Sequence, residues 1–409
     1  MNRLASTVAC WTVMTLSAVV ASAGSAPAFV TMWGSSGGTD GHFFRSFAVA
    51  VNSAHNVYVG DRATPRIQVF DSGGTFQFKW GTQGTMPGQI GEHVYDLAVA
   101  PDGSIYALDG TASQVEKYTA GGGFLLEWGA VGSQSGQFDN PRGIAVDSDG
   151  NVYVTDGNNH RIQKFSSTGT YLTQWGSSGT GDGQFGLPYG IAVDSNNNVF
   201  VTDLVQQTVQ KFTSSGVFLQ KWGSGGGGQG QLNGPAGVAF DAYDHLYVAE
   251  SGNNRIQVFT NGGQFLTAWG VPGSGPGEFN LPTDVAIAPN GDIFVSDSHR
   301  NGKNNRIVKF SPDGRYIKAA PFEMLHVAQR RSDWTDADFP SIVRAGRWNF
   351  GSFDANSDAR FDEDLAACFN CHQAMANTDF LYSTEHLLRY IRTGEPQYLY
   401  CNLRQRVPC

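Results

Sequence analysis

Four short apolar segments recur along residues 29–320 with a period of about 47 residues. Each is rich in Val, Ile, Tyr, Phe or Thr and is bounded by Gly, Asn, Asp or Ser, which is the pattern of a β-strand followed by a turn. In one repeat the expected strands are residues 143–147, 151–156, 161–165 and 171–176. The fourth segment ends in a Trp-Gly pair in six copies, at Trp33, Trp80, Trp128, Trp175, Trp222 and Trp269.

Four strands in a repeat of this length predict a β-propeller, because one four-stranded sheet cannot bury both of its faces alone. The second segment occurs six times, whereas the fourth occurs seven times, from Phe29 to Tyr316. One surplus outer strand is what ring closure requires if the first strand completes the last blade. We therefore predict an all-β, six-bladed propeller over residues 29–320. Residues 29–34 should lie beside residues 306–310, and the Tyr316 segment should lead out of the ring.

The repeats resemble the NHL family, most clearly in the stretch NPRGIAVDSDGNVYVTDGNNHRIQKF at residues 140–165. Six copies agree, so the resemblance extends over almost the whole repeat region. It implies a propeller fold and does not by itself imply an activity.

The N-terminus predicts an export signal. Arg3 precedes an apolar stretch from Val8 to Val20 and the small residues Ala21 to Ala23, an order typical of a signal peptide at residues 1–26 that is cleaved near Ala23 or Ala26. A membrane anchor is the alternative, but the apolar run is short for a bilayer. We expect a periplasmic or secreted protein without an integral membrane segment after cleavage.

Charge and cysteine content narrow the function classes. A net charge of −9, with only 15% charged residues, argues against a nucleic-acid partner. Cys10 lies in the predicted signal peptide, and the other four cysteines, Cys368, Cys371, Cys401 and Cys409, all lie near the C-terminus. The chain thus divides into a cysteine-free propeller and a tail that contains these four cysteines.

Recurrent charges inside the propeller favour structural roles. Residues 147–151 (DSDGN) look like the start of a calcium loop, but other repeats carry different turn residues there, which favours a hairpin turn. An arginine opens four of the third strands, a few residues after an acidic residue, which suits an ion pair across the connecting loop. These pairs are Arg66 with Asp61, Arg161 with Asp156, Arg255 with Glu250, and Arg306 with Asp297.

One repeat position is a candidate binding surface. Arg142, Tyr189 and Thr283 each follow a proline before the first strand, at the end that faces the channel mouth in many propellers. The repeats are similar to those of the peptidyl-hydroxyglycine amidating lyases, which imply a zinc site built from histidines. Here the corresponding positions hold Arg142, Tyr189, Ala236 and Thr283, so this lyase function is the least favoured alternative.

The tail contains a haem attachment motif. Cys368, Cys371 and His372 form C-x-x-C-H, in which the two thiols add to the porphyrin vinyl groups and the imidazole binds the iron. We therefore predict a small, partly helical c-type haem domain at residues 321–409, with these three residues binding the cofactor and His372 as the metal ligand. The residue on the other side of the iron stays open among Met324, His326 and His386, and no residue is assigned a catalytic role.

Residues 347–354 and 367–383 resemble the C-terminal part of the cytochrome P-460 family. The resemblance implies a mono-haem centre that is crosslinked to a lysine and oxidises hydroxylamine or related nitrogen compounds. However, residues 321–409 contain no lysine, and Lys318 is the last in the chain. The resemblance therefore transfers the cysteine and histidine roles, and nothing more.

Two functions from different classes follow. The first is an exported mono-haem c-type cytochrome that transfers electrons while the propeller docks a redox partner protein or binds a small ligand. The second is a cytochrome P-460-like oxidoreductase acting on small nitrogen compounds at an open iron. Cys401 and Cys409 are expected to pair or to stay as free thiols, with pairing the default in an oxidising compartment.

Overall fold

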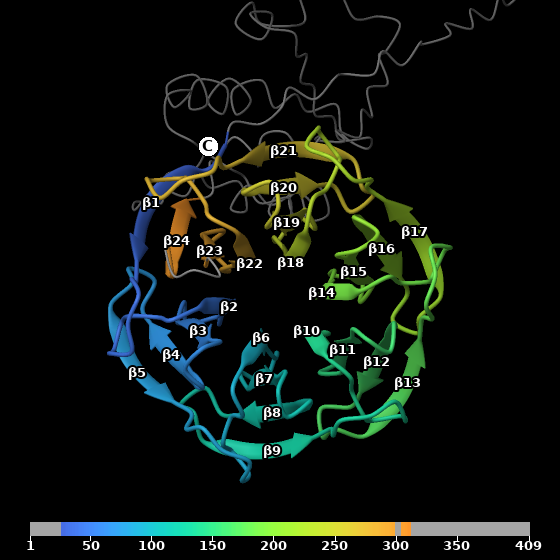
Figure 1. The fold of residues 1–409 in the computed structure, drawn as a ribbon, viewed down its shortest axis with the longest axis horizontal. Helices are drawn as coiled ribbons and strands as arrows, with labels where there is room; N and C mark the ends of the chain where they lie inside the picture. The colour runs from blue at the N-terminus through green and yellow to red at the C-terminus, as the bar shows by residue number, and fades with distance from the viewer. Residues whose placement is uncertain (1–25, 299–303, 312–409) are drawn as a thin grey trace, which may run out of the picture. The chain divides into compact units, whose positions relative to one another are not determined.

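The computed structural model describes residues 26–298 and 304–311, and these residues form six four-stranded antiparallel sheets arranged as the blades of a ring (Figure 1). The innermost strand of each blade lines the centre. In the order of blades 1 to 6 these strands are β2 (Ser46–Val51), β6 (Val94–Val99), β10 (Pro141–Val146), β14 (Pro188–Val193), β18 (Pro235–Phe240) and β22 (Pro282–Ile287).

The next two strands of each blade are almost wholly buried. The second strands are β3 (Val57–Asp61), β7 (Ile105–Asp109), β11 (Val152–Asp156), β15 (Val199–Asp203), β19 (Leu246–Glu250) and β23 (Ile293–Asp297). The third strands are β4 (Arg66–Phe70), β8 (Gln114–Tyr118), β12 (Arg161–Phe165), β16 (Thr208–Phe212), β20 (Arg255–Phe259) and β24 (Arg306–Ser311).

The outer strands consist mainly of half-buried and exposed residues, because only one of their faces packs on the ring while the other meets solvent. They are β5 (Phe76–Trp80), β9 (Phe124–Trp128), β13 (Tyr171–Trp175), β17 (Phe218–Trp222), β21 (Phe265–Trp269) and, in blade 6, β1 (Ala28–Trp33). The four predicted segments per repeat are thus confirmed. The inner strand begins two residues earlier than expected, at the proline, because a register irregularity lets Pro141 pair with Asp156 before regular pairing resumes at Ile144.

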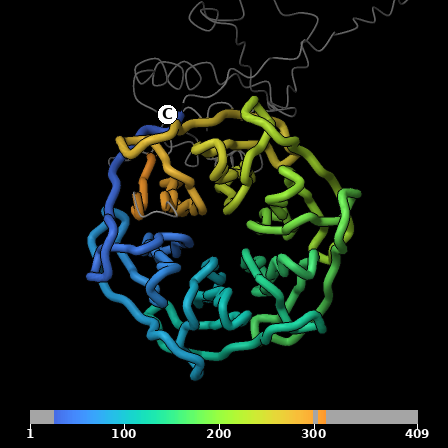
Figure 2. The backbone as a smooth tube through the Cα atoms, in the orientation of Figure 1, coloured from blue at the N-terminus to red at the C-terminus, as the bar shows by residue number. Residues whose placement is uncertain are grey.

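The ring closes with strands from both ends of the propeller. β1 pairs antiparallel with β24, with Phe29 opposite Phe310 and Trp33 opposite Ile307. Figure 2 shows the N-terminal blue segment lying on the outside of the orange strands that end the propeller. The predicted closure is confirmed. It leaves no blade with an unpaired outer position in the described ring.

The repeated tryptophans pack between neighbouring blades. Trp175 of blade 3 lies 6.2 Å from Tyr153 of its own blade and 5.9 Å from Phe212 of blade 4, measured between ring centroids. One of the apolar cores likewise joins Tyr153 and Ile162 to Val201 and Phe212 across the same boundary. Each repeat therefore buries its apolar face against the next one, which explains why the period of the sequence is the period of the fold.

Several predicted features lie outside the described residues. They are the signal peptide, apart from Ala26, the Tyr316 segment and the haem domain with its helix. The chain divides into two units, residues 1–319 and 320–409. The predicted partly helical character of the tail stays a prediction.

Candidate functional site

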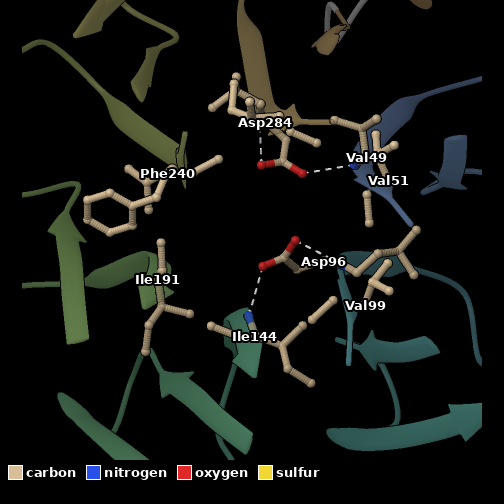
Figure 3. A pocket seen from close by; sticks show the side chains of 18 of the residues that line it. Val49, Val51, Asp96, Val99, Ile144, Ile191, Phe240 and Asp284 are labelled. Carbon is tan, nitrogen blue, oxygen red and sulfur yellow. Dashed lines mark hydrogen bonds between the residues drawn. The ribbon is translucent and has the colours of Figure 1, made fainter. Parts of the chain in front are cut away.

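The six inner strands enclose a central channel with a cavity of about 210 Å³. Its walls are largely aliphatic, from residues such as Val51, Val99, Val193 and Ile287. Two carboxylates interrupt these walls, those of Asp96 on β6 and Asp284 on β22, and they point toward one another across the channel (Figure 3). A mostly apolar cavity with a few convergent polar groups is the common form of a small-molecule site.

Each of the two carboxylates accepts two backbone N–H bonds, one from its own strand and one from the next blade. Asp96 accepts from Leu97 on its own strand and from Ile144 on β10, both at 2.8 Å. Asp284 accepts from Val285 on its own strand and from Val49 on β2, also at 2.8 Å. The aspartates therefore join blade 2 to blade 3 and blade 6 to blade 1 at the edge of the channel.

Burial favours the neutral forms of these two acids. Loss of hydration raises the pKa of Asp96 to about 7, although its two N–H bonds act in the opposite direction. Burial also raises the pKa of Asp284 well above its usual range, and the neighbouring charge of Asp96 raises it further. At neutral pH the pair therefore holds protons that exposed aspartates would have released.

The other four blades have small residues at the aspartate position, namely Ala48, Gly143, Gly190 and Gly237. A Cβ atom on Gly190 would lie 2.1 Å from the carbonyl oxygen of Ala236, so no side chain fits there. The hydroxyl of Thr202 occupies this join, accepting from Gly190 N at 2.8 Å and donating to Ala236 O at 2.8 Å. The sequence analysis did not identify the aspartates. The sequence nevertheless marks them, because two of the six repeats have Asp at the position where three others have Gly.

One end of the channel combines aromatic and cationic side chains. Arg142 and Tyr189 line it, together with Phe47, Tyr95 and Thr283. This confirms that the sequence-predicted position faces the channel, although Ala236 does not contribute to this lining. Thr283 donates a hydrogen bond to the carbonyl of Phe47 at 2.9 Å, so its hydroxyl already has a partner.

Two guanidinium groups stack in this aromatic cluster. Arg62, just after β3, lies 4.5 Å from the ring centroid of Tyr95 and donates to its hydroxyl at 2.8 Å. Arg142 lies 4.7 Å from the Tyr95 centroid and 5.6 Å from that of Tyr189. Such cation–π contacts hold the planar guanidinium groups against the aromatic rings. Among the described residues the Nε atoms of Arg62 and Arg142 are buried without a hydrogen-bond partner.

The same cluster perturbs titratable groups. Burial lowers the pKa of Arg62, and the charges of Arg45 and Arg142 lower it further against the opposing effect of the tyrosines. Burial raises the pKa of Tyr189, although Arg142 and Arg62 act against that rise. Since arginine stays protonated in proteins, this end of the channel is cationic and suits an acidic partner group.

The four predicted arginine–acid pairs are confirmed as buried structural contacts. Arg161 Nε lies 2.8 Å from Asp156, and the Arg255 Nε–Glu250 distance is 2.7 Å. The corresponding distances are 3.3 Å for Arg66 with Asp61 and 3.0 Å for Arg306 with Asp297. Arg161 also donates to the carbonyls of Gln134 and Gln137, so each arginine of this kind ties the crossing loop to its blade.

The hairpin interpretation of residues 147–151 is also confirmed. Asp147 accepts from the backbone N–H of Asp149 and Asn151 at 3.0 and 2.7 Å, and Gly150 has a φ of 82°. The carboxylate of Asp147 is therefore engaged in the hydrogen bonds of the turn. No group of three or more histidine, cysteine, aspartate or glutamate side chains that could hold a metal ion is found in residues 26–298 and 304–311.

The predicted haem ligands Cys368, Cys371 and His372 lie outside the described residues, as do Met324, His326, His386, Cys401 and Cys409. Within the described ranges, no helix has the length and apolar character required to cross a bilayer.

The fold and its repeats define an NHL-type β-propeller whose largely aliphatic central channel carries two carboxylates. The NHL repeat family model matches residues 138–165 and 232–259, which span β10–β12 and β18–β20. The cytochrome P460 family model matches residues 281–383. Both resemblances noted from the sequence are thus confirmed, and together they indicate a haem-binding propeller protein. The described part of the second match, through residue 311, forms the first three strands of blade 6.

The comparison with solved structures found matches at low sequence identity, of which the first described here, with a TM-score above 0.5, supports the fold. A protein of unknown function from Bacteroides thetaiotaomicron is 18% identical with a TM-score of 0.55, covering 69% of this chain and 76% of that one. A streptogramin B lyase is 17% identical with a TM-score of 0.46, over 65% of this chain and 93% of the other. A gluconolactonase from Xanthomonas campestris is 14% identical with a TM-score of 0.49, over 66% and 86% respectively. No curated protein matches the chain.

Proposed function

We propose that this protein is an exported mono-haem c-type cytochrome in which the tail transfers electrons and the propeller binds the partner. The C-x-x-C-H motif carries the proposal, because it lies in the segment that matches the cytochrome P460 family. Cys368 and Cys371 would hold the porphyrin and His372 would bind its iron. The bound haem would supply one-electron redox chemistry. The predicted signal peptide supports a location of this chemistry in the periplasm or outside the cell.

The role of the propeller follows from the cationic cluster of Arg62 and Arg142 between Phe47, Tyr95 and Tyr189. Its guanidinium groups have unpaired N–H donors and are held by aromatic faces, which is the composition of a recognition site for carboxylate groups. We infer that an acidic redox partner or an anionic small molecule binds at this end of the channel.

The experiment that tests the haem is a spectrum of the full chain expressed with haem-maturation machinery. A reduced-minus-oxidised spectrum with c-type bands, and a mature mass that includes one porphyrin, are expected. The Cys368→Ala/Cys371→Ala variant should lose covalent attachment, whereas Cys401→Ala, a cysteine outside the motif, should keep it. A mature chain without a porphyrin would refute the proposal, and the same mass locates the cleavage site near Ala23 or Ala26.

The second candidate is a cytochrome P-460-like oxidoreductase, favoured by the family match over residues 281–383. It predicts a high-spin, five-coordinate iron and turnover of hydroxylamine. The electron-transfer function predicts a low-spin, six-coordinate iron. The spin state of the same sample therefore separates the two functions. Metal analysis for zinc addresses the lyase alternative.

Partner binding at the propeller has its own test. Arg62→Gln/Arg142→Gln should weaken binding of the redox partner, and raising ionic strength should weaken it in the parent chain. Lys79→Gln removes an exposed charge on β5 and serves as the matched control, with unchanged binding expected. Equal affinity of all three chains would show that the partner docks elsewhere.

A further inference from the structure

The channel contains a ring of inward-pointing backbone N–H groups, one from each blade. Four of them are seen directly, since they bond to the channel aspartates: those of Val49, Leu97, Ile144 and Val285. The equivalent residues of blades 4 and 5 are Ile191 and Val238. They have the strand register of Ile144, because Ile191 pairs with Val201 and Val238 with Val248 just as Ile144 pairs with Val154. Their N–H groups therefore also point into the channel.

The acceptors for four of these six donors come from one repeat position. A carboxylate there reaches the N–H of the next residue and the N–H of the following blade, as both Asp96 and Asp284 do. The side chains that could serve Ile191 and Val238 would have to come from positions 143, 190 and 237, and all three are glycine. Two of the six donors thus lack a side-chain acceptor among the described residues.

The missing acceptor completes a threefold pattern. Asp96 joins blades 2 and 3, Asp284 joins blades 6 and 1, and the remaining donor pair belongs to blades 4 and 5. No side chain at position 190 fits between those two blades, because a Cβ atom there would be blocked by the carbonyl oxygen of Ala236. An acceptor for this pair must therefore come from the cavity itself, on the side of the channel where Ile191 and Phe240 lie in Figure 3.

The walls next to this donor pair are apolar. Val193 and Phe240 follow Ile191 and Val238 along β14 and β18, and Val51, Val99 and Ile287 occupy the same level on other blades. A cavity of about 210 Å³ has room for several waters or one small organic molecule, since a water molecule takes about 30 Å³ in the liquid. A ligand that fits needs a two-oxygen head and a short aliphatic tail.

We propose that the central channel is a binding site for a short-chain aliphatic monocarboxylic acid. Its carboxyl oxygens accept from the N–H groups of Ile191 and Val238. They serve this donor pair of blades 4 and 5 as Asp96 serves blades 2 and 3 and Asp284 serves blades 6 and 1. Its tail lies against Val193 and Phe240. The site does not depend on the haem or on the arginine cluster. A failure of this proposal would therefore not affect the proposed function, and a failure of the proposed function would not affect this proposal.

Amide NMR of the full-length, isotope-labelled chain tests the proposal, with butyrate as the probe. Butyrate should shift the N–H resonances of Ile191 and Val238 more than those of Val49 and Ile144, whose donors already have carboxylate partners. Butylamine, which has the same tail and a cationic head, should leave the Ile191 and Val238 resonances unchanged.

A channel-filling variant completes the test. Val193→Trp should raise the Kd for butyrate by about tenfold or more, whereas Leu219→Trp, the same change on an exposed residue of β17, should leave it unchanged. Circular dichroism tests whether both variants are folded. If Val193→Trp does not fold, the resonance shifts of the parent chain alone decide whether butyrate binds in the channel. No shift at Ile191 and Val238, equal affinity of the two variants, or binding of butylamine in place of butyrate would overturn the proposal.

Discussion

Replacing Asp96 by Asn should change how the stability of the propeller depends on pH. Asp96 is held at the channel edge by the N–H groups of Leu97 and Ile144. Asn keeps one carbonyl acceptor and turns its amide group toward the other N–H. That unpaired donor should cost about 1–3 kcal/mol at any pH.

Ionisation of Asp96 adds a second, pH-dependent effect. Its pKa rises from 3.8 to about 7 on folding, mainly through burial. The folded chain therefore binds a proton that the unfolded chain has released, so the contribution of Asp96 to stability is complete below about pH 4 and is lost as the pH rises to about 7. At 1.36 kcal/mol per pKa unit, this loss is on the order of 4 kcal/mol. Asn cannot ionise, so the Asp96→Asn variant does not show this pH-dependent loss of stability.

The two effects predict a reversal of stability. The parent chain should be more stable than Asp96→Asn at about pH 4.5, and less stable at about pH 7.5, because the ionisation penalty then exceeds that of one unpaired N–H. Neutralising Asp96 also lowers the pKa of Asp284 by removing a nearby negative charge, which flattens the profile further. Urea unfolding followed by tryptophan fluorescence and far-ultraviolet circular dichroism measures the difference at each pH.

The matched control is Asp182→Asn, which neutralises an exposed aspartate in the crossing between β13 and β14. Its stability should follow the parent chain at every pH. Other buried acids, such as Glu116 with a pKa raised by burial to about 8, affect the parent and both variants equally and cancel in the comparison. If the curves of Asp96→Asn and the parent chain stay parallel from about pH 4.5 to 7.5, the reasoning about the channel pair is wrong.

Three further predictions concern the ring. Trp175→Ala should lower the free energy of unfolding by about 3–5 kcal/mol in urea denaturation, because it removes the ring that packs on Phe212 of the next blade. Arg161→Ala should cost about 3–5 kcal/mol in the same assay by leaving Asp156 buried without its ion pair, and a loss below 1 kcal/mol would contradict this. Deletion of residues 28–33 should lower the thermal unfolding midpoint and promote association through the exposed edge of blade 6; an unchanged midpoint and a monomeric elution profile would show that closure through β1 is dispensable.

Much of the propeller was predictable because each repeat specifies its own blade. The alternation of Val, Ile and Tyr with turn residues determines where strands begin and end, and the Trp-Gly period counts the blades. The surplus strand near Phe29 even predicted ring closure, since β1 of the first repeat pairs with β24 of the last. Local pattern was sufficient here, because contacts in a repeat fold are made mainly with the neighbouring repeat.

The channel could be predicted only in part. Arg142, Tyr189 and Thr283 were identified as a shared position near the channel, and all three line it. Arg62 was not identified, because its turn lies far along the chain from Arg142 and only the ring brings both to Tyr95.

By itself, the sequence determined the number of blades, the ion pairs within four of the repeats and the haem motif, because each depends on residues close together in the chain. Only the tertiary structure decided that Asp96 and Asp284, which lie 188 residues apart in the sequence, face each other across one cavity. It also showed that blades 4 and 5 present a donor pair with no carboxylate of their own. The physical reason is closure: a ring juxtaposes equivalent positions of distant repeats, and their burial and charge then depend on all six blades at once.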